Sequence, residues 1–315
     1  MSLSTKKSPV GTQYCHLCGT RLLGRYYLYE TGVVCCEACQ RGRPRCARCG
    51  VPLDDASIAR QQASPSGTPA LCVRCVREAP QCAACGHPIT GSYYTFDELG
   101  AEPPRRFCER CVHNRPRCDL CRAPVAAGLR PLADGQYRCA ICARDLVLDA
   151  AEVQQIYQDA LAALQQIVRE RLRQVPRLVV TSRRELAKVR RRYASQGVSD
   201  DGIGHHVLGF FVRSGSDAAV YVERALPRGL LLGTLAHELG HAWQAESAPW
   251  VRDPMLSEGF AEWVAHHVLV ARGRQSEAAR ATRRDDLYGR ALRTMLDIEQ
   301  ARGLAGVLAA ARGRQ

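Results

Sequence analysis

A histidine–glutamate–histidine pattern near residue 240 carries the most specific chemistry in the sequence. The segment reads His237-Glu238-Leu239-Gly240-His241. Because residues four positions apart on a helix lie on one face, His237 and His241 can bind one metal ion while Glu238 lies beside it. Zn²⁺ held by imidazoles lowers the pKa of a bound water, and an adjacent glutamate can take the proton. The pattern predicts metal-dependent hydrolysis, against the plainer interpretation of a salt-bridged helix without metal.

A catalytic zinc ion needs a third protein ligand, and a later glutamate has suitable spacing. Glu258 follows His241 after 16 intervening residues, and Glu262 lies one helical turn further along the same face. We predict His237, His241 and Glu258 as the ligands of one Zn²⁺, Glu238 as the general base, and Glu262 as an acceptor for a ligand imidazole. The oxyanion formed during hydrolysis needs a further donor. The candidates, which the sequence does not rank, are Tyr221, His266, His267 and Tyr288.

Two predicted helices would position these side chains. Pro227 suits the first turn of a helix, and the leucine-rich run after it predicts a buried helix that carries both histidines. A second helix is predicted from Leu256. The remaining pattern predicts a helix capped by Asp149 and running to about Gln174, a strand over Leu178–Thr181, a basic helix over Arg184–Tyr193, and a hairpin over His206–Val222 with its turn at Ser214–Asp217.

All 17 cysteines lie between Cys15 and Cys142, and 16 of them form eight Cys-x-x-Cys pairs. The gaps between successive pairs are 17, 6, 22, 6, 22, 6 and 17 residues. Long gaps fit a loop closed around one zinc ion, and the constant short gaps fit linkers. We therefore predict four structural zinc sites: Cys15, Cys18, Cys36 and Cys39; Cys46, Cys49, Cys72 and Cys75; Cys82, Cys85, Cys108 and Cys111; and Cys118, Cys121, Cys139 and Cys142. The odd cysteine, Cys35, is predicted to be a buried small hydrophobic residue.

The cysteine spacing also repeats along the chain. Cys15 corresponds to Cys82, and Cys72 to Cys139, at the same offset of 67 residues. A module of about 65 residues has little apolar core, so metal binding would supply much of its folding free energy. The predicted domains are two double-zinc modules, at residues 12–78 and 79–145, and a third domain at residues 149–315.

Charge and hydropathy argue against some classes of protein. The formal charge of +13 falls to about +7 when four zinc-bound cysteine clusters and one catalytic zinc are counted, which weakens the case for nucleic acid as a partner. No segment approaches the ~18 consecutive apolar residues of a membrane span, and the first residues lack the apolar core of a secretory signal. We expect a cytoplasmic protein without a membrane partner, in which paired thiols bind metal.

The two cysteine modules resemble LIM domains, which are double-zinc modules that usually bind proteins. They differ in that Cys36 and Cys108 stand where many LIM domains have histidine, and in a longer spacer between the two zinc loops. We therefore describe them as LIM-like.

With both halves considered together, the sequence is similar to the plant LIM-domain metallopeptidases that limit organ size and are activated by ubiquitin. The similarity is close over ALPRGLLLGTLAHELGHAW and SEGFAEWVAH, and weaker near Tyr288 and Gly303. It implies an α+β fold, with tandem LIM-like treble-clef or zinc-ribbon modules before a mostly helical, gluzincin-like peptidase domain with a small β-sheet. It also implies an endopeptidase acting on protein substrates, the ligand and base roles given above, and ubiquitin or a ubiquitin-like protein as a partner.

Two other functions remain open from the sequence. A non-catalytic zinc scaffold would use the histidine–glutamate motif only for structure. A nucleic-acid-binding zinc protein would use the arginine runs at Arg105-Arg106 and Arg190–Arg192, although such runs more often form solvated faces.

Overall fold

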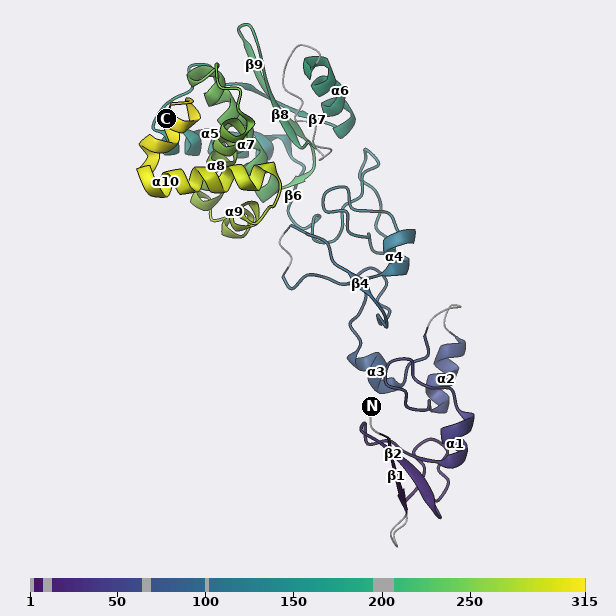
Figure 1. Cartoon of the computed structure of the whole chain (residues 1–315). Helices are drawn as coiled ribbons and strands as arrows, with labels where there is room; N and C mark the ends of the chain where they lie inside the picture. Colours follow the sequence, from purple (N-terminus) through teal and green to yellow (C-terminus); the bar gives the residue numbers. More distant parts are fainter. Residues whose placement is uncertain (1–2, 8–12, 64–68, 100–101, 195–206, 315) are drawn as a thin grey trace. The chain divides into compact units, whose positions relative to one another are not determined.

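The structure is a computed structural model that describes residues 3–7, 13–63, 69–99, 102–194 and 207–314. The chain forms two compact units, and most of their elements are labelled in Figure 1. The N-terminal unit comprises residues 1–96, 105–116 and 126–128, and the C-terminal unit comprises residues 97–104, 117–125 and 129–315. Helices are mixed with small sheets, in agreement with the predicted α+β class.

The N-terminal unit consists of short elements around cysteine turns. Its elements are β1 (Leu3–Lys7), β2 (Arg25–Tyr29), β3 (Val34–Cys36), α1 (Glu37–Gly42), α2 (Asp55–Gln62), α3 (Val73–Glu78), β4 (Tyr93–Tyr94), β5 (Phe107–Cys108) and α4 (Glu109–Asn114). The first three strands form an antiparallel sheet in the order β1-β2-β3, and β4 pairs with β5. Cys35 is fully buried in a small apolar cluster with Leu22 and Tyr26, which confirms its predicted role, and burial raises the pKa of its thiol to about 11.

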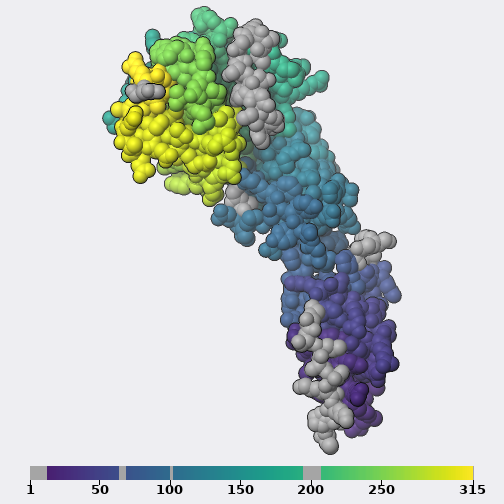
Figure 2. All heavy atoms as spheres, in the orientation of Figure 1, coloured from purple at the N-terminus to yellow at the C-terminus, as the bar shows by residue number. Residues whose placement is uncertain are grey.

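Long helices form the core of the C-terminal unit. They are α5 (Ala150–Val168), α7 (Arg228–Ser247), α8 (Pro254–Ala271) and α10 (Leu287–Ala311), accompanied by the shorter α6 (Arg183–Ala194) and α9 (Gln275–Thr282). Helix α7 packs against α5 and α8, and α8 packs against α10; Figure 2 shows the C-terminal residues, in yellow, against the green residues before them. Trp243, Phe260 and Trp263 lie in contact at the centre. None of the described helices is both long and apolar enough to cross a membrane.

A three-stranded sheet lies beside α7. Strand β9 (Asp217–Glu223) is central, parallel to β7 (Arg177–Thr181) and antiparallel to β8 (Gly209–Ser214). The predicted hairpin is thus confirmed from residue 209 onward, whereas His206 lies outside the described residues. The Glu223 N–H donates to the Leu208 carbonyl, and hydrogen-bonded pairs alternate along antiparallel strands, so the even-numbered residues of β8 bond to β9. The backbone groups of Gly209, Phe211 and Arg213 therefore point away from β9. Among the described strands, β8 is therefore an edge.

The predicted helix after Asp149 ends earlier than expected. Asp149 caps α5 as predicted, but α5 ends at Val168, so its predicted extension to Gln174 is wrong. Arg169 adopts a left-handed conformation with φ of 58°. The backbone N–H of Gln174 then donates to the carboxylate of Glu246 on α7, at 2.9 Å. In a longer helix this N–H would donate to the carbonyl of the residue four positions earlier. Here the Glu246 carboxylate takes the place of that carbonyl. Because Glu246 is distant in sequence, the local pattern of apolar residues does not predict this contact.

The fourth cysteine cluster belongs to the C-terminal unit, so the two units do not divide at the predicted boundaries near residues 78 and 145. Arg138 of this loop forms a buried ion pair with Glu223 of β9, with 3.3 Å between Nη2 and Oε1. Arg183 of α6 binds Asp119 of the same loop at 2.8 Å. Just after the loop, β6 (Leu146–Val147) pairs with β10 (Leu226–Pro227), which leads directly into α7. The composition changes after Cys142, but the packing continues across that point.

Candidate metal centres

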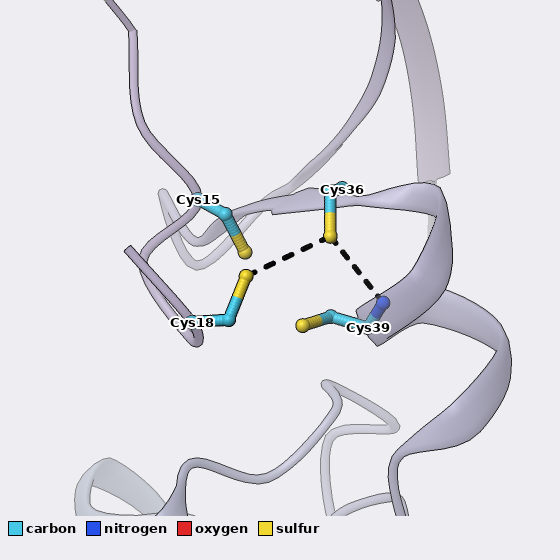
Figure 3. A group of neighbouring side chains, drawn as sticks. All are labelled: Cys15, Cys18, Cys36 and Cys39. Atoms are coloured by element: carbon cyan, nitrogen blue, oxygen red, sulfur yellow. Dashed lines mark hydrogen bonds between the residues drawn. The ribbon is translucent and has the colours of Figure 1, made fainter. Parts of the chain in front are cut away.

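The sixteen paired cysteines form four groups, with the sequential pairing that their spacing predicts. In each group the sulfurs lie within 4.8 Å of one another, and Figure 3 shows the four side chains of the first group converging. Between the first and second pairs of the four groups, sulfur atoms lie 3.8, 3.7, 3.9 and 3.6 Å apart, respectively. A tetrahedral Zn²⁺ with bonds of about 2.3 Å separates its sulfurs by about 3.8 Å. All four groups could therefore hold structural metal ions.

A recurring local structure builds these groups. The first pair lies in a tight turn in which the residue after the second cysteine donates its N–H to the first cysteine's carbonyl, as Gly19 does to Cys15 at 2.9 Å. That residue has a positive φ and is glycine in three groups, but Arg122, with φ of 64°, in the fourth. The second pair begins a helix in the first three groups, where the N-cap residues are Cys36, Cys72 and Cys108. Helix N-termini favour thiolates, the form that binds zinc.

Helices α7 and α8 bring together two imidazoles and one carboxylate. The Nε2 atoms of His237 and His241 are 3.0 Å apart. Oε2 of Glu258 lies 3.2 Å from the first and 3.5 Å from the second. Ligand atoms about 2.1 Å from a tetrahedral zinc are separated by about 3.4 Å. Glu258 Oε2 is also buried without a hydrogen-bond partner among the described residues, as expected of an atom whose partner is a metal ion.

Each imidazole has a second polar partner that orients it. Nδ1 of His241 lies 3.1 Å from Oε1 of Gln244, and Nδ1 of His237 lies 3.5 Å from Oε1 of Glu262. Acceptors at these positions favour the tautomer with the proton on Nδ1, which leaves the Nε2 lone pair available to a metal ion. Glu262 was predicted in this position. Gln244 was missed, and its only sequence signal is its place three residues after His241 on the same helix.

Glu238 lies beside the three ligand atoms in a different environment. It is 7% exposed, and its Oε2 accepts the backbone N–H of Phe211 on β8 at 2.8 Å. A Cβ at Gly209 would lie 2.5 Å from the Thr234 methyl and 3.1 Å from Glu238 Cγ, so only glycine allows β8 to approach this closely. Sequence patterns gave no sign of this contact between the edge strand and the glutamate.

Burial and the neighbouring charges shift the pKa values of the two carboxylates, Glu258 and Glu238, in opposite directions. Burial acts to raise the pKa of Glu258, but the imidazoles of His241 and His237 outweigh it and hold this pKa well below its usual range. Burial raises the pKa of Glu238. The imidazoles of His237 and His241 lower it, but by less, so the net shift is upward. Glu258 is thus anionic and could bind a metal cation, whereas Glu238 is the more basic group, suited to accepting a proton.

The four candidate oxyanion donors lie in different places. Tyr288 has its ring centroid 6.1 Å from that of His237 and, with His266, lines a pocket beside the histidines. His267 Nε2 instead lies 2.9 Å from Oε2 of Glu299. Tyr221 packs against Phe210 on the sheet, with ring centroids 6.3 Å apart. Of the four candidates, Tyr288 and His266 line this pocket, whereas Tyr221 and His267 do not.

Comparison with protein-family models, with curated proteins and with solved structures gave no match.

Gly240→Ala is expected to destabilise the C-terminal unit by roughly 1–2 kcal/mol, although alanine favours helix over glycine. A Cβ at Gly240 would lie 2.9 Å from the Ala261 Cα on α8, so the two helices would have to separate. Urea unfolding monitored by tryptophan fluorescence would measure the change. Gly233→Ala lies on the same helix, but its Cβ would meet only the Leu269 side chain, at 3.4 Å or more, so this change should keep or increase the stability. Equal effects of the two changes would contradict the close-packing argument.

Proposed function

We propose that this protein is a zinc-dependent endopeptidase. The observation that carries the proposal is the convergence of His237, His241 and Glu258 on one point, with Glu238 beside it. Two imidazoles and one carboxylate are a typical ligand set of catalytic zinc, because three protein ligands leave a coordination position for water or substrate. The predicted resemblance to LIM-domain metallopeptidases, with a gluzincin-like domain, is consistent with this arrangement.

The side chains divide the chemical work among them. A Zn²⁺ ion held by the three ligands would lower the pKa of water and polarise the substrate carbonyl. Glu238 accepts the proton of the attacking water and delivers it to the leaving amine. Gln244 and Glu262 hold the imidazoles in the tautomer that binds metal. Tyr288 or His266 donates a hydrogen bond to the developing oxyanion.

The edge of β8 favours a peptide as the substrate. Gly209, Phe211 and Arg213 direct backbone groups away from β9, and the Phe211 N–H already contacts Glu238. An extended peptide can add to such an edge through main-chain hydrogen bonds, a common mode of peptide recognition. A peptide bound in this way would pass directly beside the proposed general base.

The cysteine clusters fit a supporting role. With one zinc in each group, they would form LIM-like modules that recruit protein substrates or regulate the peptidase domain. Ubiquitin or a ubiquitin-like protein is a partner that only the family resemblance suggests.

Mild chelation is expected to abolish cleavage while leaving the cysteine-bound ions in place. The purified chain should contain about five zinc ions, and brief treatment with 1,10-phenanthroline should remove one, since a three-ligand site is open and a four-cysteine site is closed. Casein cleavage should then fall to background and return with one equivalent of Zn²⁺. Cleavage that persists after loss of the fifth ion would contradict the proposal. A fully loaded protein that cleaves nothing would favour the non-catalytic scaffold.

A further inference from the structure

A pocket of about 250 Å³ opens beside the proposed catalytic residues. His237 and Glu238 contribute to its lining, and the remaining walls come mainly from α7, α8, α9 and the start of α10. Sites for drug-sized ligands typically occupy roughly 300–1,000 Å³. This smaller volume fits one substrate side chain, held next to the group that would be hydrolysed.

Helix α7 contributes two glycines, Gly229 and Gly233, to the wall of this pocket. Glycine in a helix interior is less stable than alanine, so its presence here needs a reason. Gly229, Gly233 and His237 are spaced four residues apart, so they share one face of the helix, and all three line the pocket. A Cβ at Gly233 would meet only the Leu269 side chain, with Cδ1 at 3.4 Å and Cγ and Cδ2 at 3.8 Å. Helix packing therefore does not require glycine at this position, in contrast to Gly240. A longer side chain at residue 233 would extend into the pocket and occupy its space.

Several charged side chains in the lining already have ionic partners. Arg280 pairs with Asp97 at 3.6 Å, Arg284 with Asp286 at 2.6 Å, and Glu277 with Arg274 at 3.5 Å. Much of the remaining wall is apolar, formed by Val207, Leu208, Leu230, Ala265, Leu269 and Ala281. A charged substrate side chain would have to displace one of these ion pairs, whereas an apolar side chain would simply replace water.

We infer that this pocket selects peptides with a large apolar residue, such as leucine, methionine or phenylalanine, at one position flanking the scissile bond, and that Gly233 sets the size it accepts. The inference rests on the proposed peptidase function and adds the class of substrate. Each buried methylene contributes about fourfold in binding, and leucine has three more carbons than alanine, so leucine should be preferred over alanine by up to about 60-fold in kcat/KM.

The test uses the zinc-loaded full-length chain. The sites that it cleaves in casein are identified by mass spectrometry, and kcat/KM is measured for peptides that differ only at the two flanking positions. Gly233→Leu should lower kcat/KM for the leucine peptide by at least about tenfold more than for the alanine peptide. Ala281→Leu fills the pocket from α9 and should act in the same direction. Ala279→Leu, which adds a leucine to the exposed face of α9, is the matched control and should behave as the wild type.

A binding experiment separates specificity from turnover. Calorimetric titration with two peptidyl hydroxamates, identical except for an isobutyl or a methyl side chain, should show preference for isobutyl in the wild type and loss of that preference in Gly233→Leu. Zinc analysis and tryptophan fluorescence verify that each variant is folded and loaded.

The possible failures are distinguishable. If the wild type cleaves no peptide, the proposed function fails and this inference fails with it. If the wild type cleaves without side-chain preference at either flank, or if Gly233→Leu and Ala281→Leu lower every rate and affinity equally, the pocket assignment alone is overturned.

Discussion

Glu238→Gln is expected to lower kcat/KM for peptide cleavage by about 10²- to 10⁴-fold without changing the zinc content. The amide of glutamine cannot accept the proton of the attacking water, but its oxygen can still accept the Phe211 N–H that Glu238 now accepts at 2.8 Å. The three proposed zinc ligands are untouched, so the metal should remain. Cleavage of a fluorogenic peptide and metal analysis by mass spectrometry would measure both quantities on the same sample.

A matched control separates this loss from a general effect of removing a carboxylate. Glu185→Gln makes the same change on α6, where the side chain is half-exposed and pairs with Lys188. It should leave the cleavage rate and the zinc content at their wild-type values. A Glu238→Gln protein that retains zinc and cleaves at the wild-type rate would rule out Glu238 as the base. One that loses zinc would instead show that Glu238 supports the ligands.

Local sequence patterns were sufficient to predict those groups of residues whose spacing along the chain determines which of them lie together. Cysteine pairs recur at fixed intervals, so the pairing of all four clusters followed from the gaps alone. The same applies to His237 and His241, whose separation of four residues matches one helical turn. Glu258 depended on a second assumption, that its helix would pack against the first. The two helices can pack this closely because Gly240 and Ala261, which face each other, have no side chain or a very small one.

Features that depend on distant partners were missed. The parallel pairing of β7 with β9 joins segments separated by α6 and β8, and no turn signal announces it. Helix α5 ends at the left-handed Arg169, and Glu246 accepts from the backbone of the segment that follows. Gln244 in turn lies against the imidazole of His241. The fourth cysteine loop looks like the end of a separate module because composition changes after Cys142. Its attachment depends on Arg138 and Glu223, which are 85 residues apart in sequence.

Glu223→Gln is expected to destabilise the C-terminal unit by about 3–5 kcal/mol. The side chains of Glu223 and Arg138 are 0% and 2% exposed, and Glu223 also lies 3.4 Å from Arg183. Removing the carboxylate charge leaves the Arg138 guanidinium buried without its counter-ion, which costs more than the ion pair itself contributes. All three tryptophans, Trp243, Trp250 and Trp263, lie in this unit, so their fluorescence during urea unfolding of the full chain reports on it alone.

Two further variants test whether the buried charge is the cause. Asp217→Asn breaks the exposed pair with Arg177, at 3.8 Å, and should cost no more than about 1 kcal/mol. A double change, Arg138→Met with Glu223→Leu, replaces both charges by apolar groups and should recover most of the lost stability. If the double variant is as unstable as Glu223→Gln, the anchor is a specific hydrogen-bond network. If Glu223→Gln has no effect, the fourth cysteine loop is held to the sheet by its other contacts, such as Asp119 with Arg183.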